Sequence, residues 1–265
     1  MHLQSDDSED LKEKFSRILR RARQRILEEE PDTIGIVVDG SVARCKQGPY
    51  SDVDMIALRK SAALKKLFYF DEGIQVDIWF MAIDEYNKTP KGLDAFYDWG
   101  TGSRKVLFDK NGKTKMILAK KKVLKPTNND VQEALEHSCR NLIEYAGKVR
   151  NGWLSKDQYL VRYAAYMIAE ASQNPIIIKN NIRIVSENIL WNQLMSARRK
   201  PAHFITDYPI CLALVGIEDT QEIYLSSMRL AKESLGFIKN ELGSKITRYN
   251  VKAMLSYKEN SDIFD

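Results

Sequence analysis

The sequence contains no apolar run that approaches the roughly 18 consecutive residues of a membrane-spanning helix. Its three cysteines are odd in number and form no C-x-x-C pair, so neither a disulfide framework nor a thiolate zinc site is indicated. Residues 1–10 are acidic, where a secretory signal would be basic and then apolar. We therefore expect a cytoplasmic protein that does not insert into a membrane.

The composition is that of a globular protein with a sizeable core. Of the 265 residues, 44% are apolar and 29% are charged, which suits one or two compact domains. The formal net charge of +5 is modest. By itself it does not predict nucleic-acid binding.

The charge is distributed unevenly along the chain. The net charge is −4 over residues 1–103, +8 over residues 104–125 and +1 over residues 126–265. This change coincides with a proline- and asparagine-containing loop, so we expect two domains, 1–125 and 126–265. The basic segment 104–125 is most simply the solvated face of a helix, and contact with a polyanion is the alternative.

Hydrophobic periodicity predicts different secondary structure in the two parts. The first part is expected to form helix 8–30 and strands 33–38, 53–58, 66–70, 74–81 and 104–108, with a helical segment 83–98 broken near Pro90. Residues 71–73 predict a hairpin turn, although 61–70 could instead be helical. The second part is expected to form helices 129–150, 155–172, 181–195 and 218–241. The fold class is therefore an α/β domain followed by an all-α helical domain.

Three carboxylates carry the chemical signal. Asp52 and Asp54 are separated by one residue on a predicted strand, so their side chains point to the same face. Asp77 lies inside an apolar strand, where burial of a charge needs a strong reason. If the two strands are neighbours, the three carboxylates converge, and such an all-oxygen site favours Mg²⁺ or Mn²⁺.

A glycine-serine turn precedes the carboxylates. Gly40 and Ser41 follow the predicted strand 33–38, and ten residues separate Ser41 from Asp52. A turn of this kind can present backbone N–H groups and a hydroxyl to phosphate oxygens. Carboxylates, divalent metals and a phosphate-holding turn together describe two-metal phosphoryl or nucleotidyl transfer. The simpler alternative is a hairpin edge in which Asp52 and Asp54 are only solvated.

This arrangement resembles the signature of the nucleotidyltransferase superfamily, which includes DNA polymerase β and the antibiotic nucleotidyltransferases. The resemblance covers about residues 30–110 and implies a catalytic domain with a mixed sheet. The helical second half is similar in kind to the substrate domain of kanamycin and related antibiotic nucleotidyltransferases. The flanking Ala43-Arg44 and Ser51 are also similar to the family's usual sequence.

The resemblance implies a role for each motif residue. Gly40 and Ser41 would hold the triphosphate, with Arg44 and Ser51 in the same nucleotide-binding segment. Two Mg²⁺ ions, or Mn²⁺, would be bound by the three acids Asp52, Asp54 and Asp77, the third of which would help to bind the catalytic metal near the acceptor hydroxyl. Asp39 departs from the family pattern, in which a small or apolar residue is commoner; it either points outward or pairs with Arg44.

The implied activity is Mg²⁺-dependent transfer of a nucleoside monophosphate, most plausibly AMP from ATP, to a hydroxyl, with release of pyrophosphate. We expect the acceptor to be a small antibiotic-like molecule, while RNA 3′ ends and protein hydroxyls remain open. The alternative function is that of a nucleotide-binding regulatory or antitoxin-like protein that acts by binding a partner.

Several residues of the second half are weaker candidates. A general base could come from a helical acid, although each is more simply a surface charge: Glu136, Glu144 and Glu170. His137 is more often a packed or solvated side chain than a base. The helical spacing of Tyr159, Tyr163 and Tyr166 favours core packing, and stacking on a sugar or base is the alternative.

Overall fold

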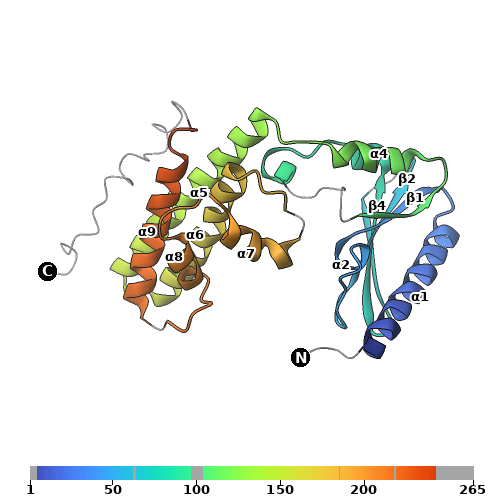
Figure 1. Cartoon of the computed structure of the whole chain (residues 1–265), viewed down its shortest axis with the longest axis horizontal. Helices are drawn as coiled ribbons and strands as arrows, with labels where there is room; N and C mark the ends of the chain where they lie inside the picture. The colour runs from blue at the N-terminus through green and yellow to red at the C-terminus, as the bar shows by residue number, and fades with distance from the viewer. Residues whose placement is uncertain (1–4, 62–63, 97–103, 185, 218, 243–265) are drawn as a thin grey trace. The chain divides into compact units, whose positions relative to one another are not determined.

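The computed structural model describes residues 5–61, 64–96, 104–184, 186–217 and 219–242. It divides into two compact units, drawn in Figure 1: Met1–Pro90 with Asp98–Lys125, and Lys91–Tyr97 with Pro126–Asp265. Residues 97–98 of the predicted helical segment 83–98, and residue 218 of the last predicted helix, lie outside the described residues. None of the described helices is both long and apolar enough to cross a membrane.

Unit 1 is built on a five-stranded mixed sheet. Its strands are β1 (Thr33–Val38), β2 (Val53–Arg59), β3 (Lys65–Asp71), β4 (Ile74–Ala82) and β5 (Lys105–Asp109), in the order β3-β4-β2-β1-β5. Strands β2 and β4 are parallel, and the other neighbouring pairs are antiparallel. The mixed sheet expected from the resemblance is confirmed, and the bounds of β1 are those predicted from its β-branched run.

Helix α1 (Ser5–Glu29) covers one face of this sheet, as Figure 1 shows. Its side chains Phe15, Ile18, Ala22 and Ile26 recur at helical spacing and are buried against alternate residues of the strands. This packing leaves the opposite side chains of β2 and β4 on the other face, where the acidic residues lie.

Helix α4 (Lys113–Lys122) lies on that other face, against β1. Ile117 and Leu118 are buried there in a small apolar cluster. Gly35 permits the contact, since a Cβ at this position would lie 2.0 Å from the Thr114 hydroxyl oxygen. The basic segment 104–125 is therefore part strand (β5) and part helix (α4). The helix is not wholly solvated, because Lys121 is buried and donates to the Lys88 carbonyl (2.7 Å).

The predicted hairpin between β3 and β4 is present, and its turn is Glu72-Gly73, in which both residues have positive φ (48° and 75°). The alternative of a helix over 61–70 is wrong, because β3 occupies 65–71. The predicted segment 83–98 forms two short pieces, α3 (Ile83–Tyr86) and η1 (Gly92–Phe96), on either side of Pro90.

Unit 2 is helical, as predicted. It contains η1, α5 (Asn128–Leu154), α6 (Gln158–Lys179), α7 (Glu187–Ser196), α8 (Phe204–Cys211) and α9 (Thr220–Ile238). Its core lies mainly between α5, α6 and α9. A capping box between Thr127 and Asp130 starts α5, and Asp130 also accepts the Gly92 N–H (2.9 Å), which attaches η1 to this unit. Helix α8 was not predicted, because it is short and contains Pro209.

Candidate active site

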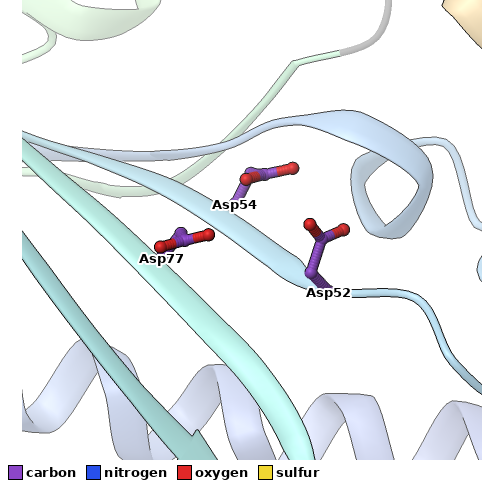
Figure 2. A group of neighbouring side chains, drawn as sticks. All are labelled: Asp52, Asp54 and Asp77. Atoms are coloured by element: carbon purple, nitrogen blue, oxygen red, sulfur yellow. The ribbon is translucent and has the colours of Figure 1, made fainter.

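The structure brings Asp52, Asp54 and Asp77 together. Asp54 of β2 and Asp77 of β4 are direct partners in the parallel register, and Asp52 lies one residue before β2. One carboxylate oxygen from each side chain lies within 4.8 Å of the others, and Figure 2 shows the three side chains gathered at adjoining strands. The apolar neighbours of Asp54, Val53 and Met55, point into the opposite core.

The three acids differ in their exposure to solvent. Asp52 is exposed, Asp54 is half-buried and Asp77 is buried. Burial raises the pKa of Asp54 to about 6, and the negative charges of Asp52, Asp39 and Asp77 act in the same direction. A cation bound between these groups would relieve that repulsion.

The surroundings of Asp77 fit a hard cation. Gln75 donates to one oxygen, Oδ2 (2.8 Å), and the Lys66 ammonium lies 3.0 Å from the other, Oδ1. Oδ1 is buried, and its contact with Lys66 lacks hydrogen-bond geometry, so it accepts no hydrogen bond from the described residues. The three carboxylates form the all-oxygen donor set that suits Mg²⁺ or Mn²⁺. One of their oxygens, Asp77 Oδ1, is buried and accepts no hydrogen bond from the described residues.

Gly40 lies beside this cluster, at the start of the short helix α2 (Gly40–Ala43). Its φ is +67°, and a Cβ added to it would lie 3.0 Å from Asp54 Oδ2. Both the backbone conformation and the close carboxylate therefore require glycine. The Gly40 N–H donates to Asp39 Oδ1 (2.7 Å), and the phosphate-binding role of Gly40 stays a prediction.

Asp39 belongs to an ion pair. Its Oδ2 lies 2.6 Å from Arg104 Nε, and the side chain of Arg104 is only 10% exposed. Arg104 also donates to the Tyr86 hydroxyl (3.4 Å). The outward-pointing Asp39 is therefore wrong, and the partner in the structure is Arg104 rather than the expected Arg44. Sequence reasoning missed this pair because its members are 65 positions apart and no local pattern links them.

Ser51 shapes the loop that leads to Asp52. Its hydroxyl accepts the Gly48 N–H (2.9 Å), and its own N–H donates to the Gly48 carbonyl (3.1 Å). Arg44 caps the end of α2 with a backbone N–H that donates to the Gly40 carbonyl. These contacts describe positions near the cluster, and the nucleotide-binding roles of Ser41, Arg44 and Ser51 stay predictions.

The acids proposed as general bases in unit 2 have local helical partners. Glu136 accepts from Gln132, Glu144 pairs with Lys148 (2.7 Å), and Glu170 accepts from Gln173 (2.8 Å). Each partner lies three or four residues away on the same helix. His137 contacts Asn141 in the same manner (3.1 Å).

The three tyrosines of α6 are exposed rather than packed in the core. Tyr159 is 77% exposed, Tyr163 43% and Tyr166 47%. The core-packing interpretation is therefore wrong. Their helical spacing places the rings together on the outer face of α6, where Tyr159 and Tyr163 stack with ring centroids 6.3 Å apart.

Residues 138–240 match a family model described as the nucleotidyltransferase substrate-binding domain. This part of the chain is therefore similar to the substrate-binding domain of nucleotidyltransferases. The matched segment runs from within α5 to just beyond α9, so it lies in unit 2. The acidic cluster lies outside the matched segment, and its assignment therefore rests on the geometry described above.

A solved structure is also similar to this chain. It is the crystal structure of a nucleotidyltransferase-like protein from Exiguobacterium sibiricum 255-15, with 16% identity and a TM-score of 0.48, covering 91% of this chain and 81% of that chain. The comparison with curated proteins finds no match.

Proposed function

We propose that this protein is a nucleotidyltransferase that transfers AMP from ATP to a hydroxyl of a small acceptor and releases pyrophosphate. The observation that carries the proposal is the meeting of Asp52, Asp54 and Asp77, with carboxylate oxygens within 4.8 Å of one another, on a parallel strand pair. A cluster of this kind, half-buried and on one sheet face, concentrates negative charge where a divalent ion would be held.

Asp52, Asp54 and Asp77 would hold Mg²⁺, with Mn²⁺ as a substitute. Bound there, the ions would supply electrostatic stabilisation of the attacking and leaving oxygens of an in-line displacement. The three carboxylates would fix the position of the reacting phosphate relative to the acceptor oxygen. Gly40, without a side chain, keeps the space beside Asp54 open to the nucleotide.

The transfer exchanges one bond to the α-phosphorus for another. A bond forms from the acceptor oxygen to the α-phosphorus, and the bond from this phosphorus to the bridging oxygen of pyrophosphate breaks. The acceptor proton leaves to a base or to water. Arg104 would neutralise Asp39, which otherwise repels the triphosphate next to Gly40.

The test is to follow ATP labelled at the α-phosphate in the presence of Mg²⁺. A panel of hydroxylated small molecules, total RNA and cell-extract protein supplies the acceptors. We expect label on a small molecule, with the rate reduced at least about 100-fold in Asp54→Asn. Asp84→Asn is the matched control, because Asp84 is exposed and lies on α3 away from the three acids.

Two results would change the conclusion. Label on RNA or protein would keep nucleotidyl transfer and replace the acceptor class. Label that stays in ATP with every acceptor, while ATP still binds, would contradict the proposal in favour of a regulatory, partner-binding role.

A further inference from the structure

Unit 2 contains a cavity of about 460 Å³ between α6, α7 and α8. Its lining includes Tyr166, Glu170 and Gln173 from α6, Trp191 from α7, Tyr208 from α8 and Leu214. It lies within the segment that matches the substrate-binding family, but neither the match nor the activity assigns it a ligand.

One face of α6 supplies the polar side of the cavity. Tyr166, Glu170 and Gln173 follow one another at spacings of four and three, so they lie along the same stripe of the helix. The opposite stripe, which includes Ala165 and Ile168, is buried in the core and holds the helix in place. The cavity wall is therefore a fixed surface rather than a loop.

Aromatic rings form the other walls. The Trp191 ring stacks on Tyr208 with centroids 5.6 Å apart and planes at 30°, and Tyr208 stacks in turn on buried Phe204 (4.5 Å). Trp191 and Tyr166 nevertheless remain 36% and 47% exposed. The Trp191 ring is thus held by stacking and still lines the cavity, as does the Tyr166 ring, and aromatic rings so placed can contact a ligand.

The charge of the cavity favours a cation. Glu170 brings a carboxylate, oriented by the amide of Gln173 (2.8 Å). Tyr208 remains a neutral phenol, because burial raises its pKa and the nearby charge of Glu170 raises it further. A carboxylate beside electron-rich ring faces is the combination that attracts ammonium groups and repels anions.

We propose that this cavity binds an organic cation, with its ammonium group between Glu170 and the rings of Tyr166 and Trp191 and its apolar body against Leu214. If this cation is the molecule that carries the acceptor hydroxyl, that part of the inference rests on the proposed nucleotidyl transfer. The binding itself does not depend on catalysis.

Two probes differ only in the charged atom. Choline carries a quaternary ammonium and a hydroxyl, and 3,3-dimethyl-1-butanol has carbon in place of the nitrogen. The readout is the indole N–H signal of Trp191 in a ¹⁵N spectrum of the full chain, assigned by its loss in Trp191→Phe. We expect choline to shift this signal saturably at millimolar concentration and to bind about tenfold more tightly than the neutral alcohol.

Substitutions in the lining are compared with matched controls. Glu170→Gln should weaken choline binding about tenfold, whereas Glu222→Gln on α9 makes the same charge change outside the cavity and should leave it unaltered. Tyr166→Leu should also weaken binding, and Tyr159→Leu should not, because Tyr159 is exposed on the same helix but does not line the cavity.

The outcomes separate this inference from the proposed function. Equal binding of the two probes, no saturable shift with choline, or unchanged binding in Glu170→Gln would overturn the cation site even if nucleotidyl transfer is observed. Choline binding that persists in Asp54→Asn supports the site, and it does so even if no acceptor is ever labelled.

Discussion

The guanidinium of Arg104 lies 2.6 Å from the carboxylate of Asp39, one residue before the glycine that borders the acidic cluster. The same carboxylate accepts the Gly40 N–H, so Arg104 holds the turn through Asp39. The pair joins the start of β5 to the end of β1, and it cancels a negative charge that would otherwise oppose a triphosphate.

Replacing Arg104 with Gln should therefore harm both stability and nucleotide binding. The half-buried Asp39 carboxylate would lose its charged partner, at a cost of about 2 kcal/mol in the free energy of unfolding. Urea unfolding measures this cost, and ATP titration should show weaker binding. The double variant Asp39→Asn, Arg104→Gln should recover part of the stability. Additive losses in the double variant would mean that the two side chains do not act as a pair.

A methyl group at position 40 should destabilise the protein. Gly40→Ala forces an L residue to φ +67° and brings Cβ to 3.0 Å from Asp54 Oδ2, so we expect a loss of about 1–2 kcal/mol. Gly48→Ala is the matched control, because nothing lies within 4 Å of a Cβ added there. Similar urea midpoints for the two variants would contradict the constraint at Gly40.

The response of stability to Mg²⁺ should depend on pH. The pKa of Asp54 is raised to about 6 in the folded chain, so the folded state binds more protons than the unfolded state between the ordinary aspartate pKa and about 6. The contribution of Asp54 to the free energy of unfolding is therefore favourable while the carboxyl group is protonated, and it is lost as the pH rises through about 6. We expect Mg²⁺ to raise the melting temperature more at about pH 7.5 than at about pH 5.

Asp54→Asn is the variant that checks this reasoning. It should remove most of the dependence of the Mg²⁺ effect on pH, and it should melt at or above the temperature of the unaltered chain when no metal is added and the pH is neutral. An equal Mg²⁺ effect at both pH values in the unaltered chain would contradict a proton–metal competition at this carboxyl group.

Lys66 should compete with a divalent ion for Asp77. Its ammonium lies 3.0 Å from Asp77 Oδ1, and the side chain is 43% exposed. Lys66→Met removes this competing charge, so Mn²⁺ should bind about threefold more tightly, a modest gain because solvent screens the lysine. Calorimetric titration with Mn²⁺ measures the change. Lys65→Met is the control, since Lys65 pairs instead with Glu30. Weaker Mn²⁺ binding in Lys66→Met would show that the lysine supports the site.

The sequence predicts those parts of the fold that local patterns determine. The β-branched run 33–38, the apolar stripe of α1 and the Glu72-Gly73 turn each depend on a few neighbouring residues. The sequence also predicts that Asp54 and Asp77 lie close together, because a single charge in an apolar strand implies a partner on a neighbouring strand.

Other features depend on contacts between distant positions. Nothing in the basic segment distinguishes Lys121, which is buried, from its solvated neighbours. The stripe of tyrosines on α6 has the spacing of a core stripe, and only the packing of α5 and α9 on the other side of α6 leaves it exposed. Periodicity identifies a face of a helix, but it does not say whether that face meets the core or a ligand.

The contact between Gly35 and Thr114 has an evolutionary consequence. The threonine hydroxyl stands where the first side-chain carbon of any other residue at position 35 would be. Position 35 can therefore not change alone: a larger residue in β1 requires a smaller one in α4, or the helix must leave the sheet. Among homologues that keep this helix on this strand, we expect a larger residue at position 35 to occur only together with a smaller residue at position 114.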